Sequence, residues 1–407
     1  MDTFQVMAKP IGPVCNLCCE YCFYRHKVKK FSREHDWKMD RKTLELYVRS
    51  YIESQPIGVP VTFVWQGGEP TLRGLDFFED AVELQKKYQR PGQKIANAFQ
   101  TNAVLVDSEW GRFFKENHFL VGVSVDGPGA IHDHYRKDAA GHGSFDKVMR
   151  GVDHLRTHGV EHNALVCVTD ISIEDPLLIY SFISKAFDFI QFIPVVQKMD
   201  FVSQAPFIKA GRGQKKPKND SRSATSWSVS ADGWGHFLNT VFDEWLRHDV
   251  GRIFVQIFDE TLAHTMGSPG GLCMFDKTCG RALALEHNGD LYACDHFVYP
   301  EYWLGNIKDR ELKAMALSGF QTAFGRDKFR RLPGQCRRCE YLGLCGGGCP
   351  RNRFIKTKNK EEGLNYLCQG YRAYFAHTKR AMQYMAGEIM QQRPAANVMQ
   401  VAEPLIS

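Results

Sequence analysis

The chain has 407 residues, and 43% of them are hydrophobic, which is enough to bury the core of one large domain and a smaller one. Its formal net charge is +6, a mild basic excess that does not by itself indicate a nucleic-acid partner. Thirteen cysteines without a secretion signal favour metal binding or redox chemistry over a disulfide framework.

The sequence shows no targeting or membrane-spanning pattern. Lys9, Pro10 and Gly12 interrupt the start of the chain too early for a signal peptide. The longest apolar run, Leu177–Val196, is broken by charged and polar residues before it reaches membrane-spanning length. We therefore expect a cytoplasmic protein that binds neither membrane nor nucleic acid.

Residues 1–196 alternate between strand and helix patterns. The expected strands are short apolar or β-branched runs: Phe4–Ala8, Val61–Trp65, Ile95–Gln100, Phe119–Val125, Asn163–Val168 and Phe189–Val196. Helical periodicity lies between them, at Asp40–Ile52, Phe77–Tyr88 and Ser144–His158. Alternating strands and helices indicate a parallel sheet, and six such units predict an α/β fold with a partial (β/α)6 TIM-like barrel. Barrels of this kind carry their chemistry at the C-terminal ends of the strands.

A cysteine loop follows the first expected strand directly. Cys15, Cys19 and Cys22 have the spacing Cys-x3-Cys-x2-Cys, so three thiolates on one tight loop can hold three corners of a cubane iron–sulfur cluster. The fourth iron would then stay open for a substrate, as the open position of a catalytic zinc site does. A zinc loop or a set of buried thiols is the alternative, with His26 nearby and Cys18 as a spare thiol.

The second expected strand ends in the sequence WQGGEPTL. Gly67 and Gly68 remove side chains where the backbone has to approach a ligand closely, and Glu69 supplies an acceptor for an ammonium group. Gln66 is expected to point into the same cavity. On its own, GGEP is also compatible with an ordinary turn at the end of a strand.

Together, the cysteine loop and the GGE sequence resemble the radical S-adenosylmethionine (SAM) enzymes. The resemblance implies that the methionine part of SAM chelates the open iron, and that Gly68 and Glu69 bind its amino group. The aromatic residue before the last cysteine, Tyr21, fits the same pattern. By the same resemblance Ser124 and Arg136 contact the ribose and carboxylate of SAM, and Val196 lines its adenine. The alternative for each of these is a turn, cap or core residue.

The composition changes after residue 200. The stretch 203–228 is polar and basic, which predicts a linker or insertion, or alternatively a docking patch for a protein substrate. An amphipathic helix is expected next, at Asp232–His248. The expected domains are a barrel at 1–200, an insertion at 201–232, a cysteine-rich domain at 233–390 and a tail at 391–407.

A second group of cysteines occupies residues 273–368. It has eight members, the number needed for two four-cysteine sites, either clusters or zinc: Cys273, Cys279, Cys294, Cys336, Cys339, Cys345, Cys349 and Cys368. The arrangement resembles the SPASM domain, which binds two auxiliary 4Fe-4S clusters. The resemblance assigns Cys273, Cys279, Cys294 and Cys349 to the first auxiliary cluster. It assigns the remaining four, Cys336, Cys339, Cys345 and Cys368, to the second.

Asp295 directly follows one of these predicted ligands. A carboxylate there adds negative charge to an anionic site, which suits a general base better than a structural role, although a solvated turn carboxylate is the alternative. The stretch around it, like the chain from Cys15 to Cys368, is similar to the anaerobic sulfatase-maturating enzymes, in which the matching aspartate is the proposed base.

This resemblance implies an enzyme with three 4Fe-4S clusters that uses SAM to oxidise a Cys or Ser of a sulfatase to Cα-formylglycine. A 5′-deoxyadenosyl radical would abstract hydrogen from Cβ, with Tyr24 and Gln66 orienting the peptide. The implied partners are an unfolded or nascent sulfatase with a Cys/Ser-x-Pro-x-Arg motif, and reduced flavodoxin or ferredoxin as electron donor. Two alternatives stay open: another SPASM-type peptide maturase, and a non-enzymatic iron–sulfur electron carrier or metal-stapled binding module. The thirteenth cysteine, Cys167, is expected to pack in a barrel strand.

Overall fold

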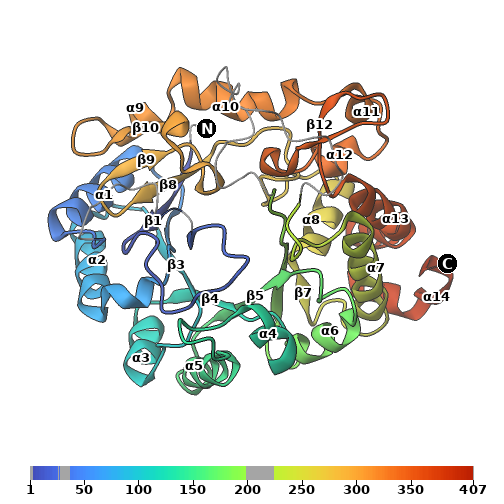
Figure 1. The fold of residues 1–407 in the computed structure, drawn as a ribbon, viewed down its shortest axis with the longest axis horizontal. Coiled ribbons are helices and arrows are strands. Elements are labelled where there is room, and N and C mark those ends of the chain that lie inside the picture. Colours follow the sequence, from blue (N-terminus) through green and yellow to red (C-terminus); the bar gives the residue numbers. More distant parts are fainter. Residues whose placement is uncertain (1–2, 26, 28–36, 199–223, 407) are drawn as a thin grey trace. The chain divides into compact units, whose positions relative to one another are not determined.

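The computed structural model describes residues 3–25, 27, 37–198 and 224–406. His26 and most of the predicted insertion lie outside the described residues. Figure 1 labels the helices and strands of the chain. The chain forms two compact units, each assembled from segments that are distant in sequence. The first unit comprises residues 1–125, 132–163 and 280–325, and the second comprises residues 126–131, 164–279 and 326–407.

The first unit is built on a mixed sheet. Its strands are β1 (Gln5–Lys9), β2 (Val61–Trp65), β3 (Ile95–Thr101), β4 (Phe119–Ser124), β8 (Ala282–Glu286), β9 (Asp290–Tyr292) and β10 (Trp303–Asn306). They lie in the order β10-β9-β8-β1-β2-β3-β4, parallel from β8 to β4 and antiparallel between β8, β9 and β10. β8 therefore covers the free edge of β1, with Gln5 opposite Ala282 and Lys9 opposite Glu286.

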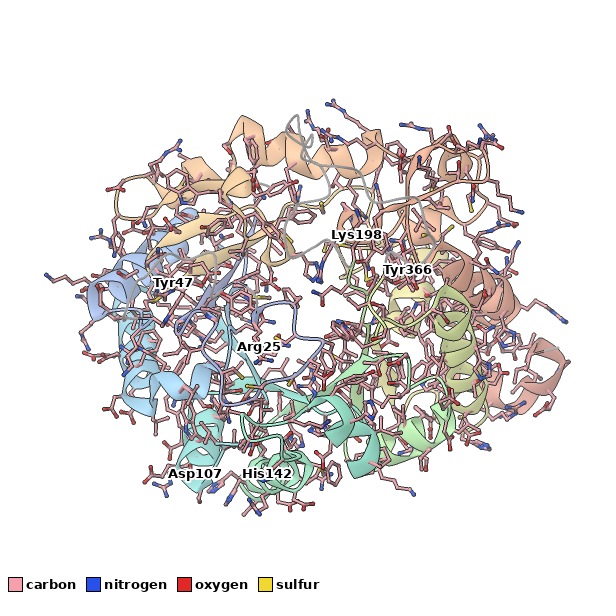
Figure 2. All side chains as sticks on the ribbon, viewed as in Figure 1. Arg25, Tyr47, Asp107, His142, Lys198 and Tyr366 are labelled. Carbon is pink, nitrogen blue, oxygen red and sulfur yellow. The ribbon has the colours of Figure 1, made fainter. Side chains whose placement is uncertain are left out.

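Helices with one apolar face cover this sheet. They are α1 (Arg41–Ser54), α2 (Leu75–Tyr88), α3 (Ser108–Glu116), α5 (Phe145–Thr157) and α9 (Leu312–Ala316), with short turns η2 (Pro70–Arg73), η4 (Asp295–Phe297) and η5 (Pro300–Tyr302). α1 starts where the Asp40 side chain accepts a hydrogen bond from the Thr43 backbone, a standard helix N-cap. Tyr47 of α1 (Figure 2) packs edge-on against Phe63 and Trp65 of β2, with ring centroids 5.5 and 5.9 Å apart.

The second unit contains β6 (Phe189–Pro194), β7 (Phe254–Val255) and most of β5 (His162–Val168), which are parallel to one another. Its helices are α6 (Pro176–Ser184), α7 (Ala231–His248), α8 (Gln256–Thr265), α11 (Gly334–Arg337), α12 (Leu342–Cys345), α13 (Cys368–Met390) and α14 (Glu403–Ile406). Shorter elements are η6 (Pro350–Asn352), β11 (Ile355–Lys356), β12 (Glu362–Leu364) and η7 (Ala395–Val401). α4 (Gly129–Tyr135) and α10 (Gly319–Arg330) each contribute residues to both units.

Two glycines let α7 and α13 approach closely. A Cβ at Gly370 would lie 2.1 Å from the Ala231 carbonyl oxygen, and one at Gly235 would lie 3.0 Å from the Gly370 Cα. Aromatic rings fill the rest of this contact, including Trp234 against Tyr371 at 6.3 Å. No described helix is long and apolar enough to cross a membrane.

All six expected strands and all four expected helices are present, with ends that differ by at most two residues. The sequence reasoning did not identify β8, β9 and β10, which complete the sheet of the first unit.

Candidate active site and cluster ligands

The loops after β1 and β2 are joined by backbone hydrogen bonds. The Gly68 N–H donates to the Gly12 carbonyl at 2.7 Å, and the Glu69 N–H donates to the Val14 carbonyl at 2.9 Å. A Cβ at Gly68 would lie 1.9 Å from the Val14 oxygen, so only glycine permits this approach. The structure therefore brings the cysteine loop and the GGE sequence together, as the sequence predicts.

The three loop cysteines lie at this junction, with Cys19 buried and Cys15 and Cys22 half-buried. Burial, the nearby Glu69 carboxylate and the neighbouring Cys22 raise the pKa of Cys15 to about 12. A thiol in such surroundings keeps its proton until a metal replaces it. Cys18 lies on the same loop and its backbone N–H donates to the Lys137 carbonyl at 2.6 Å.

Glu69 is fully buried and links two strand ends. Its Oε1 accepts hydrogen bonds from the Thr71 backbone and hydroxyl, at 3.1 and 2.8 Å, and from the Thr101 hydroxyl at 2.7 Å. Its Oε2 accepts from the Asn102 backbone at 2.7 Å. Since a carboxylate oxygen can accept more than one hydrogen bond, Oε2 can still accept one from an ammonium group. Burial raises the pKa of Glu69 and these donors oppose the rise.

Tyr21 and Arg136 also meet at the cysteine loop. The Tyr21 ring packs edge-on against Tyr135, with centroids 5.9 Å apart, and the Arg136 guanidinium lies 5.5 Å from the Tyr21 ring centroid. The charge of Arg136 acts to lower the pKa of Cys15, so Arg136 faces the loop. Ser124 is half-buried at the end of β4, and Val196 is buried beyond β6 in the second unit.

A buried polar cluster lies beside these loops in the first unit. The Tyr24 hydroxyl lies 2.6 and 2.7 Å from the two carboxylate oxygens of Glu286, and burial together with this carboxylate raises the pKa of Tyr24. The Asp295 carboxylate forms an ion pair with Lys9, with Nζ 2.5 Å from Oδ1. Lys27 donates to the Asp295 backbone carbonyl at 2.8 Å.

Asp295 begins η4, immediately after Cys294, and its side chain is only 18% exposed. The carboxylate is therefore largely shielded from water, and its role as a general base stays a prediction. Burial acts to raise the pKa of Asp295, but the charges of Lys9 and Lys27 outweigh it and hold that pKa well below the usual range. The same two lysines offset the negative charge that Asp295 adds beside Cys294.

Sequence reasoning missed Lys9 and Glu286, which face each other across β1 and β8. Both are fully buried. A charged residue that closes an apolar strand at the catalytic end of a barrel is the signal that points to Lys9.

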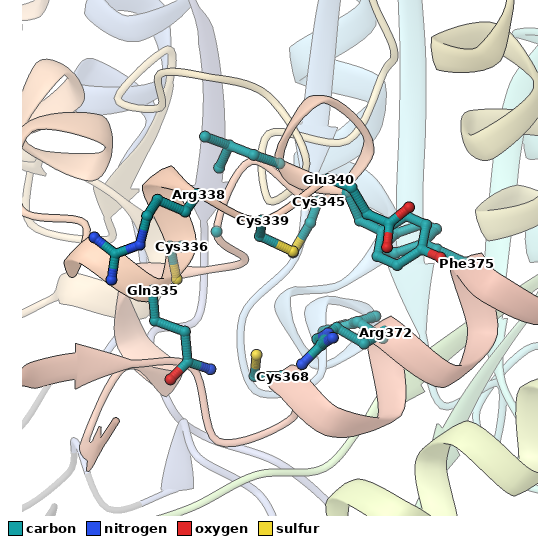
Figure 3. A pocket seen from close by; sticks show the side chains of 13 residues that line it. Gln335, Cys336, Arg338, Cys339, Glu340, Cys345, Cys368, Arg372 and Phe375 are labelled. Carbon is teal, nitrogen blue, oxygen red and sulfur yellow. The ribbon is translucent and has the colours of Figure 1, made fainter. Parts of the chain in front are cut away.

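In the second unit, four cysteines line one cavity of about 310 Å³ (Figure 3): Cys336, Cys339, Cys345 and Cys368. Cys345 ends α12 and Cys368 begins α13, so helix termini present both thiols. Burial and the neighbouring cysteines raise the pKa of Cys345 to about 12 and that of Cys368 to about 11. The cavity is thus lined by four mutually close thiols, which fits the second predicted cluster.

Three further cysteines of the second unit form a separate group: Cys273, Cys279 and Cys349. Burial and mutual repulsion raise the pKa of Cys279 to about 12 and that of Cys273 to about 11. Cys294, the fourth predicted ligand of this set, belongs to the first unit. Cys167 is half-buried in β5.

Two buried cations accompany the cysteines of the second unit. The Arg353 guanidinium donates to the carbonyls of Gly346, Gly347 and Gly348 at 3.2, 2.9 and 3.0 Å, and the Lys328 amine donates to the Asp276 carbonyl. Burial lowers the pKa of both, and the surrounding cysteines oppose this. Arg353 and Lys328 donate here to neutral carbonyls, so their positive charges can offset the negative charge of an iron–sulfur cluster. The donor sets therefore fit iron–sulfur clusters. Within the described residues, no three Cys, His, Asp or Glu side chains are grouped to hold a single metal ion.

Comparison with known proteins defines the class. The model of the radical SAM superfamily matches residues 10–183, and that of the SPASM iron–sulfur cluster-binding domain matches residues 273–340. The chain is thus a radical SAM enzyme with an iron–sulfur domain, which confirms the predicted α/β fold and the predicted cofactors, 4Fe-4S clusters and SAM.

Relatives narrow the class further. The chain is 47% identical to the serine-type anaerobic sulfatase-maturating enzyme of Bacteroides thetaiotaomicron, over 97% of this chain and 94% of the relative. It is 32% identical to the cysteine-type enzyme of Clostridium perfringens strain ATCC 13124, over 93% and 96% of the two chains. The chain belongs to the anaerobic sulfatase-maturating enzyme family.

Solved structures agree with this assignment. The structure of native anSMEcpe with bound AdoMet and Cp18Cys peptide superposes with a TM-score of 0.81 at 31% identity, covering 95% of this chain and 99% of that one. Streptococcus suis SuiB bound to its precursor peptide SuiA, at 15% identity and a TM-score of 0.60, covering 90% of this chain and 76% of that one, shares the fold alone.

Proposed function

We propose that this enzyme oxidises a Cys or Ser residue of an unfolded or nascent sulfatase to Cα-formylglycine. The observation that carries the proposal is the placement of Asp295. This largely buried carboxylate lies beside Cys294 and contacts Lys9, at the end of the strand from which the Cys-x3-Cys-x2-Cys loop starts. The family of the chain supports the same reaction.

Each group of residues has a proposed role. Cys15, Cys19 and Cys22 hold the SAM-binding cluster, with Tyr21, Gly68, Glu69, Ser124, Arg136 and Val196 around SAM. The first auxiliary cluster takes Cys273, Cys279, Cys294 and Cys349. The second takes the four cysteines that line the 310 Å³ cavity, Cys336, Cys339, Cys345 and Cys368.

The clusters and SAM supply the radical that takes a hydrogen atom from the substrate Cβ and the acceptor for the remaining electron. Asp295 accepts the thiol or hydroxyl proton of the substrate, so the loss of one hydrogen atom, one proton and one electron leaves a thioaldehyde or an aldehyde. Water then hydrolyses the thioaldehyde. Tyr24 and Gln66 orient the peptide near Cβ, since a radical attacks whichever C–H bond lies closest.

The substrate and partners follow from the same family. The 47% identical relative is named serine-type, so we expect a peptide with Ser-x-Pro-x-Arg to react, and its Cys counterpart to be the comparison. Reduced flavodoxin or ferredoxin is the proposed electron donor, and the cytoplasm is the proposed location.

The test uses the anaerobically reconstituted, reduced full-length enzyme with SAM and either peptide, followed by mass spectrometry. With the wild-type enzyme we expect the mass of the Ser peptide to fall by two hydrogen atoms. With the Asp295→Asn variant we expect no oxidised peptide, while deoxyadenosine still forms. Deoxyadenosine with unchanged peptides would favour another SPASM-type maturase. A protein that holds its clusters but makes no deoxyadenosine would instead be an electron carrier.

A further inference from the structure

Lys9 is the last residue of β1 and is fully buried. Its amine lies 2.5 Å from Asp295 Oδ1, 3.3 Å from the Met7 sulfur and 4.7 Å from the centroid of the Tyr24 ring, and it donates a hydrogen bond to Gln66 Oε1. A buried ammonium group is costly unless it is paired and hydrogen-bonded. Lys9 therefore depends on Asp295 and Gln66, and each of them depends on Lys9.

The lysine also fixes which atoms of Gln66 are free. An ammonium group only donates, so it binds the Gln66 oxygen, and the Gln66 amide nitrogen then donates to Gln100 Oε1 at 2.6 Å. A chain of contacts runs from Asp295 through Lys9 and Gln66 to Gln100, across the C-terminal ends of β1, β2 and β3. What Gln66 can still offer to a substrate is its second N–H.

A second carboxylate nearby does not compete for Lys9. Glu286 lies opposite Lys9 in register, but both of its oxygens contact the Tyr24 hydroxyl. Lys9 Nζ pairs with Oδ1 of Asp295. The lysine thus holds the carboxylate through that oxygen.

We propose, on the basis of the proposed function, that Lys9 is a positioning residue that holds the Asp295 carboxylate and the Gln66 amide in the orientation in which they meet the substrate Cys or Ser. In this role Lys9 acts through Asp295 and Gln66 and not on the reacting Cβ itself. Its contribution is a fixed geometry, with one Asp295 oxygen and one Gln66 N–H directed at the substrate.

The first test is Lys9→Met in the reconstituted holoenzyme, because Met keeps the length of the side chain and removes its charge and donors. We expect at least a tenfold fall in kcat for formylglycine, a smaller change in the KM for the peptide, and more deoxyadenosine per product. Lys9→Arg, which retains a cation, should recover part of kcat. Lys94→Met removes an exposed lysine before β3 and is the control for net charge. Unchanged kcat and product ratio in Lys9→Met would overturn the proposal.

The second test needs no turnover. Thermal unfolding of the holoenzyme is measured for Lys9→Met, Asp295→Asn and the double variant. Each single variant leaves an unpaired buried charge or acceptor, so we expect the double variant to unfold at a higher temperature than either single variant. Additive losses would overturn the pairing.

If Lys9→Met fails to take up its clusters, recovery of cluster loading in the double variant supports the pairing, and no recovery overturns it. Failure of the wild type to make formylglycine would refute the proposed reaction and leave the unfolding cycle intact as a test of the pair.

Discussion

At the scale of single residues, burial decides what the ionisable groups can do. Burial raises the pKa values of Cys15 and Cys279 to about 12, so both thiols stay protonated until a metal binds and displaces the proton. Glu69 is fully buried but accepts four hydrogen bonds from residues of η2 and the β3 end. The same loss of water therefore gives metal ligands in one case and a rigid acceptor in the other.

The first prediction concerns Glu69→Gln. In this variant an NH2 group, which only donates, replaces one of the two accepting carboxylate oxygens. It then faces another donor, either the Asn102 N–H or the donors of Thr71 and Thr101. We expect the free energy of unfolding to fall by about 1–3 kcal/mol, as for one unsatisfied buried group, and SAM binding to weaken. Thermal unfolding and equilibrium SAM binding measure both. Glu83→Gln, an equal charge change at an exposed position, is the control, and an equal effect in both variants would contradict the prediction.

The second prediction concerns pH. Burial raises the pKa of Asp259 in α8 to about 6, so the fold favours the protonated carboxyl. That stabilisation is fully present below about pH 3.9, the pKa of an exposed Asp, and is lost as the pH rises through about 6. At pH 8 the free energy of unfolding of Asp259→Asn should therefore exceed that of the wild type by roughly 1–2 kcal/mol, after allowance for partial exposure. The gain should shrink as the pH falls toward 5, and a gain that is constant with pH would rule out this cause.

At the scale of elements, glycines and the side chains that fill the space beside them shape the cluster loops. Gly346, Gly347 and Gly348 have φ values of +54°, +77° and +67°, and Arg353 binds all three of their carbonyls. Three consecutive glycines favour such a tight turn. The sequence does not predict Arg353, because only the folded loop turns the three carbonyls toward one guanidinium group.

The third prediction follows from this loop. Arg353→Met removes three hydrogen bonds to the loop between two cluster ligands, Cys345 and Cys349, a fourth to the Lys328 carbonyl, and a buried positive charge. We expect a lower unfolding temperature and a loss of iron equal to at least one cluster per chain. Arg330→Met, at an exposed position in α10, should retain full iron content. Iron analysis and thermal unfolding measure both effects, and full iron content in Arg353→Met would contradict the prediction.

The fourth prediction concerns the junction of the first two loops. Gly68→Ala would place a Cβ 1.9 Å from the Val14 carbonyl oxygen and push the loops apart. We expect loss of the SAM-binding cluster and of deoxyadenosine formation, while the auxiliary clusters remain, so iron should fall by about a third. At Gly319 a Cβ meets nothing within 4 Å, so Gly319→Ala should keep all its iron. Loss of iron from the auxiliary clusters as well would argue against a local effect.

At the scale of the whole molecule, a late segment of the chain pairs with the first strand, β1. The segment 280–325 carries Cys294 and Asp295 and belongs to the first unit, where β8 pairs with β1. The sequence predicts the strand–helix repeats and both cysteine groups because their signals are local. It does not predict β8 or the Lys9–Asp295 pair, since pairing between distant strands leaves no periodic trace and buried charges interrupt the apolar pattern that marks strands. The predicted domain limits stay a prediction.

The fifth prediction tests this pairing. A chain that ends at residue 272 contains all of residues 10–183, which match the radical SAM model, but it lacks β8. The edge of β1 would then be unpaired, and we expect aggregation where the full chain stays dispersed under the same conditions. Light scattering after size-exclusion chromatography measures this. A dispersed, folded fragment would show that β8 is dispensable.

The pairing of β1 with β8 also means that β1 is synthesised long before its partner strand. β1 leaves the ribosome about 280 residues before its partner β8, which at 5–20 residues per second is an interval of roughly 15–55 s. Throughout that interval the strand that carries Lys9 has one open edge, and Asp295 does not yet exist to neutralise the lysine. The catalytic centre can therefore be completed only after β8 and Asp295 have been synthesised.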